Sequence, residues 1–293
     1  MPTQKERSLA RIEYLKALEQ KEKLSSGLPH LYRYKFYTWS RKFFESTNRF
    51  NFLTAANQIG KSTVQITKAI DWATDKKKWP MLWRTEPRQF WYLYPTKEIA
   101  TTEVYEKWIP DILPAGEFKQ VGPYSWTLET DGRHVKAIHF TSGVSIYFKT
   151  YAQDENRLQA GTVHAIFADE ELPEHLFEEL NFRLAAVDGF YHNVFTATLG
   201  QEKWRKVMQP GPKEEEIYPT AFKMQISTYD CLMFEDGTRS HWTIEKIELQ
   251  KAFCRSEAEI QKRLFGRFVV DEGLKYPSFS PEKNVKQYHH IPP

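Results

Sequence analysis

One stretch of the chain places small, basic and hydroxyl residues at a spacing that can bind phosphate groups. Residues 55–63 read Ala-Ala-Asn-Gln-Ile-Gly-Lys-Ser-Thr, which follows the phosphate-loop pattern small-x-x-x-x-Gly-Lys-Ser. In such a loop Gly60 lets the backbone turn close to the phosphates, Lys61 reaches the β- and γ-phosphates, and the Ser62 hydroxyl ligates Mg²⁺. The residues predicted to bind the nucleotide are Ala55, Asn57, Gln58, Ile59, Gly60, Lys61, Ser62 and Thr63.

The flanking sequence distinguishes a phosphate loop from a chance match, because Gly-Lys-Ser alone is common and Ala55 stands where the pattern usually has glycine. Phe50, Phe52 and Leu53 form an apolar run short enough for a strand. Apolar residues then recur through 64–72 as in a helix. A helix N-terminus supplies N–H donors and a favourable dipole to an anion, so we expect a strand, a loop and a helix around the phosphates.

A second stretch carries acids at the end of an apolar run. Residues 163–168 read as a buried strand and are followed by Asp169, Glu170 and Glu171. Open α/β sheets place their chemistry at the carboxyl ends of such strands. We assign Asp169 to the Mg²⁺ shell, chiefly through water, and Glu170 to orienting or deprotonating the water that attacks the γ-phosphate. Glu171 is expected behind these two acids or at a helix cap; the alternative is that all three acids only open the helix at Pro173.

Two further segments are candidates for roles around the γ-phosphate. Arg157 could neutralise transition-state charge, in its own subunit or in a neighbour's site, with Arg183 as a weaker competitor. The alternative for Arg157 is a surface salt bridge with Asp154 or Glu155. A strand at 192–198 ends in Thr196, Ala197 and Thr198, which could sense the γ-phosphate and couple its loss to movement, although these residues alone would read as an ordinary strand end.

The rest of the pattern alternates strands with helices, which predicts an α/β fold with a mostly parallel central sheet flanked by helices. Besides the segments above, strands are expected at 90–96 and 222–227, and a hairpin at the sheet edge at 137–140 and 144–149. Helices are expected at 98–108 and, as a pair, at 243–265, where Ser256 and Glu259 form a capping box and Gly266 ends the second helix.

These elements suggest four parts. We expect an N-terminal helical arm at 1–27, an ATPase core at 28–209, the last core strand with a small helical lid at 210–270, and a linker at 271–293. The aromatic and basic segment 28–49 is interpreted as a wall of the adenine pocket; a core-facing helix or a nucleic-acid contact are the alternatives.

The composition narrows the class of protein without naming a function. The 293 residues have a formal net charge of +3, which neither requires nor excludes nucleic acid. Two cysteines cannot build a disulfide framework, so a reducing compartment is expected. The chain has no apolar run long enough to span a membrane and does not begin like a signal peptide, so we expect a protein that is not secreted.

Several of these motifs together resemble the large terminase subunit of tailed phages. They are the loop at 56–62, Asp-Glu-Glu-Leu-Pro at 169–173 with Arg183 beyond it, Thr-Ala-Thr at 196–198, and Gly-Leu-Lys-Tyr-Pro-Ser-Phe at 273–279. The resemblance implies a P-loop ATPase of the additional-strand type that uses ATP and Mg²⁺. Two positions depart from the pattern of many relatives: Asn57 replaces an arginine, and Ser40 or Arg41 stands where the adenine motif has glutamine.

The resemblance also implies a function and partners. It implies a motor that hydrolyses ATP to move double-stranded DNA through a portal protein into a procapsid, with a small terminase subunit as a further partner. It implies a pentameric ring on the procapsid, with the monomer as an alternative in solution, in the cytoplasm of an infected bacterium. The family's nuclease half would begin about where this sequence stops, so we expect an isolated ATPase domain without nuclease activity.

Two other functions compete with this one. A helicase-like DNA translocase would need a second RecA-like lobe, for which residues 220–293 are too few. A degenerate nucleotide-binding scaffold has no chemical need for Glu170 beside Lys61 and Asp169. Hydrolysis that is lost on replacing Glu170, with nucleotide binding kept, would separate an ATPase from a scaffold.

Overall fold

The structure is a computed structural model that describes residues 11–17, 34–113, 125–151 and 161–269. Its strands are β1 (Phe50–Ala55), β2 (Gln89–Tyr94), β3 (Trp126–Asp131), β4 (His134–Phe140), β5 (Ser145–Thr150), β6 (Ala165–Asp169), β7 (Phe190–Phe195) and β8 (Phe222–Ile226). The α-helices are α2 (Thr38–Glu45), α3 (Lys61–Thr74), α4 (Pro80–Trp83), α5 (Lys97–Glu103), α7 (Glu174–Ala185), α8 (Glu202–Met208), α9 (Ile244–Phe253) and α10 (Glu257–Phe265). A π-helix, η2 (Val104–Ile112), a 3-10 turn, η4 (Thr228–Cys231), and a helical segment at 11–17 complete the described chain.

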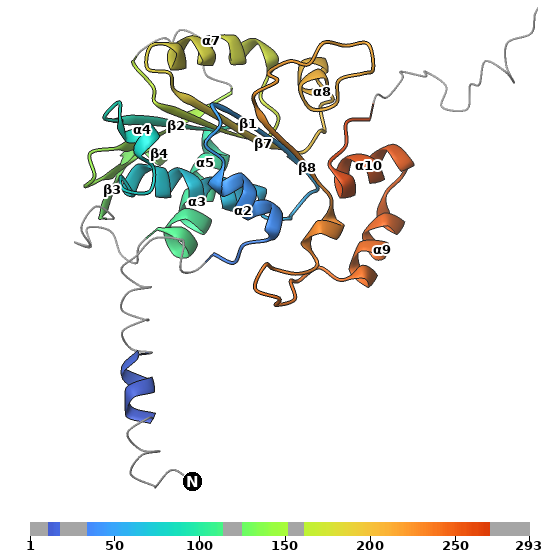
Figure 1. Cartoon of the computed structure of the whole chain (residues 1–293), viewed down its shortest axis with the longest axis horizontal. Helices are drawn as coiled ribbons and strands as arrows, with labels where there is room; N and C mark the ends of the chain where they lie inside the picture. The colour runs from blue at the N-terminus through green and yellow to red at the C-terminus, as the bar shows by residue number, and fades with distance from the viewer. Residues whose placement is uncertain (1–10, 18–33, 114–124, 152–160, 270–293) are drawn as a thin grey trace, which may run out of the picture.

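The eight strands form one mixed sheet in the order β3-β4-β5-β2-β6-β7-β1-β8 (Figure 1). All pairs from β5 to β8 are parallel, and only the β3-β4-β5 extension at one edge is antiparallel. This confirms the predicted α/β fold, the mostly parallel sheet and the edge hairpin. The strand β7 lies between β1 and β6, so the segment after β1 and the acids of β6 approach each other across an additional strand.

Helices cover both faces of the sheet, so the sheet separates two hydrophobic cores (Figure 1). Residues of α2, α3, α5 and η2 form the larger core, which includes Trp72, Trp108 and Phe43. Residues of α7 and α8 form the second core, which includes Leu180 and Trp204. Strands buried on both faces explain why β1, β2, β6 and β7 read as near-continuous apolar runs.

The expected helix at 98–108 is correct in position and wrong in type over its second half. Thr96 accepts a hydrogen bond from the Ile99 N–H and starts α5, but from Val104 the chain continues as a nine-residue π-helix. Pro110 inside η2 lacks an N–H donor, which disfavours a regular α-helical ladder there. Trp108 of η2 donates its indole N–H to the Tyr94 hydroxyl at 3.0 Å, so the wider turn is tied to strand β2.

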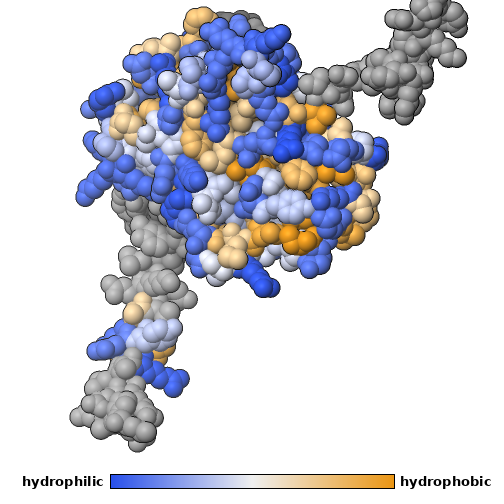
Figure 2. Space-filling model, turned by 45° about the vertical axis from the view of Figure 1, so that its right-hand side comes forward, coloured by the Kyte–Doolittle hydropathy of each residue, from blue (hydrophilic) through white to orange (hydrophobic). Residues whose placement is uncertain are grey.

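The helices α9 and α10 lie beside β8, at the right-hand side of Figure 1. Ser256 accepts a hydrogen bond from the Glu259 N–H, and Gly266 ends α10 with a φ of 60°, as the capping box and the glycine predict. Figure 2 turns this side forward and shows hydrophobic surface on it. Met233, Ile244, Leu249 and Phe253 are the large hydrophobic residues of this part that are exposed, with Phe253 at 72%.

Within the described ranges, no helix is both long and apolar enough to cross a membrane. The predicted strands and helices are otherwise present, and residues 210–219 form an irregular segment before β8, as expected. The short helices α4 and α8 were not predicted. Most of the arm at 1–27 and all of the linker at 271–293 lie outside the described residues.

Candidate phosphate and magnesium site

The phosphate loop follows β1 and ends in a helix N-terminus. Gly60 takes a left-handed φ of 90° immediately before α3, and Gln58 takes a φ of 57°. Glycine suits such a turn because it has no Cβ, and the first N–H groups of α3 have no partner within the helix. Lys61, the first residue of α3, is only 6% exposed, so its ammonium group is held close to the loop. Ser62 and Thr63 follow it, both half-buried.

The acids at the end of β6 meet the first turn of α3. The Ser62 hydroxyl donates to the Asp169 carboxylate at 2.8 Å. Lys61 Nζ lies 3.9 Å from Glu170 Oε1, and the Glu170 side chain is 47% exposed. A hydroxyl and a carboxylate are the hard oxygen donors that Mg²⁺ prefers, so Ser62 and Asp169 fit a magnesium ion beside phosphate groups.

The environment of Asp169 disfavours its charge before any cation binds. Burial raises the pKa of Asp169 to about 6, and the negative charge of Glu170 adds to the rise. Hydrogen bonds from Ser62 and Tyr92 and the charge of Lys61 act in the opposite direction on this pKa. A divalent cation at this position would therefore offset the electrostatic cost of placing two neighbouring carboxylates, one of them buried, at the end of β6.

Glu170 has an unusual backbone that the surrounding chain holds in place. Its φ is 74°, a left-handed value that costs energy for a residue with a side chain. Its N–H continues the sheet by donating to the Val194 carbonyl at 2.9 Å, while its own carbonyl accepts from Asn193 Nδ2 at 2.9 Å and from the Tyr151 hydroxyl at 3.1 Å. A strained backbone of this kind persists only where surrounding contacts hold it, and such residues cluster at functional sites.

The Thr-Ala-Thr triplet follows the end of β7 and reaches the phosphate loop through one residue. Thr196 Oγ1 donates to Asn57 Oδ1 at 2.8 Å, and both Thr196 and Ala197 are buried. Thr198 is exposed, and its N–H and hydroxyl turn back to the Thr196 carbonyl. The Asn57 N–H donates to the Arg263 carbonyl of α10 at 2.9 Å, so Asn57 joins the end of β7 to the helix pair beside β8.

Glu171 holds the chain beyond the triplet. Its carboxylate accepts hydrogen bonds from the N–H groups of Leu199 at 2.7 Å and Gln201 at 2.9 Å. Burial raises the pKa of Glu171, and these backbone donors oppose the rise. Its carboxylate therefore stabilises the start of α8 and not the helix α7 that directly follows it.

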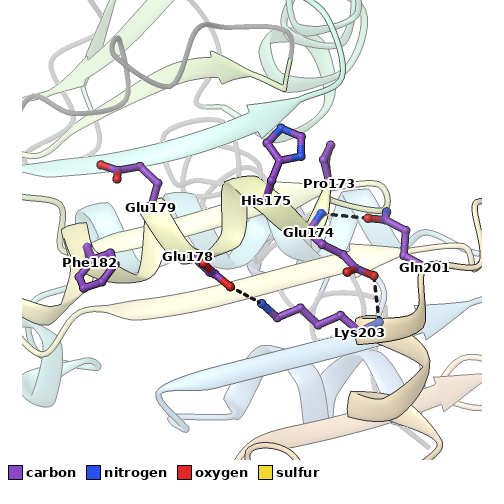
Figure 3. Close-up of a pocket in the computed structure, with 8 residues that line it drawn as sticks. All are labelled: Pro173, Glu174, His175, Glu178, Glu179, Phe182, Gln201 and Lys203. Atoms are coloured by element: carbon purple, nitrogen blue, oxygen red, sulfur yellow. Dashed lines mark hydrogen bonds and ion pairs between the residues drawn. The ribbon is translucent and has the colours of Figure 1, made fainter.

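A groove of about 820 Å³ lies beside this site without containing it (Figure 3). Its lining residues are Pro173, Glu174, His175, Glu178, Glu179, Phe182, Gln201 and Lys203, none of which belongs to the phosphate loop or the acidic pair. Glu174 exchanges contacts with the start of α8, because its N–H donates to Gln201 at 2.9 Å and its carboxylate accepts from the Lys203 N–H at 2.9 Å. The groove thus marks the junction of α7 and α8, and size alone does not identify the nucleotide site.

Other sequence predictions have different outcomes. Arg157 lies outside the described residues. Arg183 donates to Glu179 one helical turn earlier on α7 and is thereby engaged in an ion pair. The aromatic side chains Phe36, Tyr37, Trp39, Phe43 and Phe44 are buried in the larger hydrophobic core, which is the packing role weighed against the adenine-pocket interpretation.

Sequence reasoning did not identify three side chains that support the acidic pair: Tyr92, Tyr151 and Asn193. Tyr92 donates to Asp169 at 2.9 Å, Tyr151 donates to the Asp169 and Glu170 carbonyls, and Asn193 donates to the Ala168 and Glu170 carbonyls. The sequence feature that could have identified Tyr92 and Asn193 is a polar group within an otherwise apolar strand. Buried polar groups require partners, so such residues point toward a polar site.

Comparison with solved structures shows that this fold is similar to that of phage large terminases. The large terminase ATPase domain of Thermus phage P74-26 matches with a TM-score of 0.57 and 16% identity, over 80% of this chain and 95% of that chain. The large terminase of the thermophilic bacteriophage D6E matches with a TM-score of 0.56 and 12% identity, over 85% of this chain and 57% of that chain. A structure of the D6E protein in complex with ADP matches with a TM-score of 0.55 and 15% identity, over 84% of this chain and 57% of that chain.

No protein-family model and no curated protein matches the chain. The fold is α/β, with helices on both faces of a mostly parallel sheet. Among solved structures it resembles the ATPase domains of phage large terminases.

Proposed function

We propose that this chain is a magnesium-dependent ATPase and the motor domain of a phage large terminase, which hydrolyses ATP to move double-stranded DNA into a procapsid. The observation that carries the proposal is the meeting of Ser62 with Asp169 at 2.8 Å and of Lys61 with Glu170 at 3.9 Å. A phosphate loop brought against an acidic pair is the arrangement that phosphoryl transfer requires.

Each residue has a definite task in this proposal. The backbone N–H groups after Gly60 and the ammonium of Lys61 bind the phosphates. Ser62 and Asp169 would hold Mg²⁺, which supplies charge neutralisation at the β- and γ-phosphates when it is bound. Glu170 orients the attacking water and accepts its proton; the partial exposure of its carboxylate leaves room for that water.

Lys61 and Glu170 are placed so that nucleotide binding can change their contact. The Lys61 ammonium lies 3.9 Å from the Glu170 carboxylate. Lys61 would also bind a γ-phosphate, and Glu170 would then be free to contact water. Thr196, Ala197 and Thr198 then couple the state of the loop to the rest of the domain through Asn57, which contacts both β7 and α10.

Assembly and partners follow from the motor role. We propose double-stranded DNA, the portal protein and the small terminase subunit as partners in the cytoplasm of an infected bacterium, with the chain forming a pentameric ring. Phe253 at 72% exposure, Leu249 at 55% and Phe182 at 74% are hydrophobic groups available to protein neighbours. Arg157 is proposed to act on the γ-phosphate of its own or a neighbour's site. We also propose the four-part organisation, in which the last core strand and a small helical lid occupy 210–270.

The test is nucleotide binding and phosphate release by wild type, Lys61→Ala and Glu170→Gln, with and without Mg²⁺. We expect binding by wild type, at least a tenfold loss in Lys61→Ala, and binding without hydrolysis in Glu170→Gln. Lys76→Ala and Glu178→Gln are matched controls, since both side chains are exposed and lie outside the site. A wild-type protein that binds no nucleotide would overturn the proposal. Hydrolysis that survives in Glu170→Gln would show that another residue acts as the general base. Nucleotide binding without any hydrolysis, in the ring assembled on its procapsid, would support the nucleotide-binding scaffold instead.

A further inference from the structure

Tyr92 is a buried side chain that contacts the proposed magnesium ligand from behind. It lies on β2, is fully buried, and donates its hydroxyl hydrogen to Asp169 Oδ2 at 2.9 Å. The register of the sheet explains the contact, because Tyr92 is paired with Phe167 on the adjacent strand β6, two residues before Asp169. The Tyr92 and Phe167 rings stack with centroids 6.1 Å apart, which directs the phenol along the sheet toward the end of β6.

The two oxygens of Asp169 therefore have different donors. Ser62 donates to Oδ1 from the phosphate loop, and Tyr92 donates to Oδ2 from the sheet. A carboxylate bonded on one oxygen alone can rotate about its last torsion, whereas two donors on opposite oxygens fix its plane. Once Ser62 turns toward a cation, Tyr92 is the donor that keeps the Asp169 carboxylate oriented.

Other contacts in turn fix Tyr92. Gln65 Nε2 lies 3.4 Å from the Tyr92 hydroxyl and donates to the Ala168 carbonyl at 2.9 Å, so α3 buttresses both β2 and β6. The Tyr92 ring also packs edge-on against Trp108 with a centroid distance of 5.0 Å. The hydroxyl thus accepts from Gln65 and donates to Asp169, and the ring has little freedom to move.

We propose that Tyr92 is a positioning residue for Asp169 that sets the affinity of the site for Mg²⁺. The inference rests on the proposed function, because it takes Asp169 to be a magnesium ligand. Residues behind a metal ligand typically contribute 10–100-fold to metal affinity by holding the ligand in orientation. Tyr92 touches neither the phosphate loop backbone nor Lys61 through any hydrogen bond described above, so its removal is expected to spare metal-free nucleotide binding.

Tyr94 is a matched control on the same strand. It is also fully buried and two residues away, so it lies on the same face of the sheet, but its hydroxyl accepts a hydrogen bond from the Trp108 indole and has no hydrogen bond to Asp169 among those of the described residues. Tyr92→Phe and Tyr94→Phe each delete one buried hydroxyl from the same aromatic cluster. Both variants remove a hydroxyl from a cluster in which the two tyrosine rings lie 4.9 Å apart, but only Tyr92→Phe removes the hydrogen bond to Asp169.

The experiment measures ADP binding to wild type and both variants over a range of free Mg²⁺, together with thermal unfolding. We expect about a tenfold rise in the Mg²⁺ concentration for half-saturation in Tyr92→Phe alone, with similar melting temperatures and unchanged ADP affinity in EDTA. A second titration follows Mn²⁺ alone by water-proton relaxation, without nucleotide. Wild type that binds no nucleotide would overturn the proposed function while this second titration still tests Tyr92. Equal behaviour of Tyr92→Phe and Tyr94→Phe in both titrations would overturn the positioning role.

Discussion

Replacing Gly266 with alanine should separate the helix α10 from the phosphate loop. A Cβ at position 266 would lie 2.6 Å from the Ala55 Cα, 2.7 Å from its carbonyl carbon and 2.9 Å from its nitrogen. All three atoms belong to the backbone at the end of β1, so no side chain can rotate away to make room. Thr54, which donates to the Gly266 carbonyl at 2.8 Å, holds the two segments together at this point.

The expected loss of folding stability in Gly266→Ala has two parts, which a control variant can separate. Alanine at a left-handed φ costs roughly 1–2 kcal/mol, and overpacking a close contact costs about 1–3 kcal/mol more. Gly132 has a φ of 59°, against 60° for Gly266, but an added Cβ there meets nothing within 4 Å. Gly132→Ala should therefore show the first cost alone, and Gly266→Ala both.

Chemical denaturation and thermal unfolding of the two variants provide the assay. The difference between them should be about 1–3 kcal/mol, with a melting temperature about 2–4 °C lower for each kcal/mol. Nucleotide affinity should fall only in Gly266→Ala, because the adjacent Asn57–Arg263 bond belongs to the loop. Equal losses of stability in both variants would refute the reasoning, since they would show that the contact with Ala55 yields without cost.

Two further predictions concern buried polar groups in the larger core. Burial, and to a smaller extent the charge of Lys68, holds the pKa of His192 well below 6.5. Below pH 6.5 the unfolded chain therefore binds a proton at this residue that the folded chain does not bind. The free energy of unfolding should therefore fall by about 1 kcal/mol between pH 6.5 and 5.5. Urea unfolding of His192→Phe should lack this part of the pH dependence. If the free energy of unfolding of His192→Phe changes with pH as it does in wild type, the prediction is wrong. Lys68 donates to the Phe43 carbonyl at 2.8 Å and the Ser46 carbonyl at 2.6 Å at the end of α2. Lys68→Met leaves both carbonyls buried without this donor and should cost about 2–4 kcal/mol by denaturation, whereas the exposed Lys76→Met should cost almost nothing; equal effects would count against the reasoning.

The sequence was sufficient for the local elements of this fold. Short apolar runs predicted β1, β2 and β6, and Ser256 with Gly266 predicted both ends of α10, because strand burial and helix capping depend on neighbouring residues. The left-handed turn at Gly60 and the start of α3 at Lys61 were predictable for the same reason, since the residues of this loop are consecutive. The π-helix η2 was not, because its apolar spacing does not differ enough from that of an α-helix over nine residues.

The supporting residues of the site could not be predicted from local pattern. Tyr92 reaches Asp169 only because β2 pairs with β6 in one particular register. The order of strands in a sheet cannot be predicted from any single short segment of sequence. The contact of Thr196 with Asn57 likewise needs β7 to lie beside β1. The left-handed backbone of Glu170 has no sequence signal, since glycine or asparagine would be the expected residue there.

The position of β1 in the sheet has a consequence for how the chain acquires its structure. The strand β1, the first in the described part of the chain, lies next to the edge strand β8 and is paired on its other side with β7, and both partners are far along the chain. Such non-local pairing is slow, because the entropy of closing a long loop is lost before any hydrogen bond between the strands can form. During synthesis, β1 and the phosphate loop must wait until residues 222–226 have emerged and α10 can close against Ala55. The segment at 50–63 is thus translated early and assembled late, and until then its apolar strand is open to incorrect pairing.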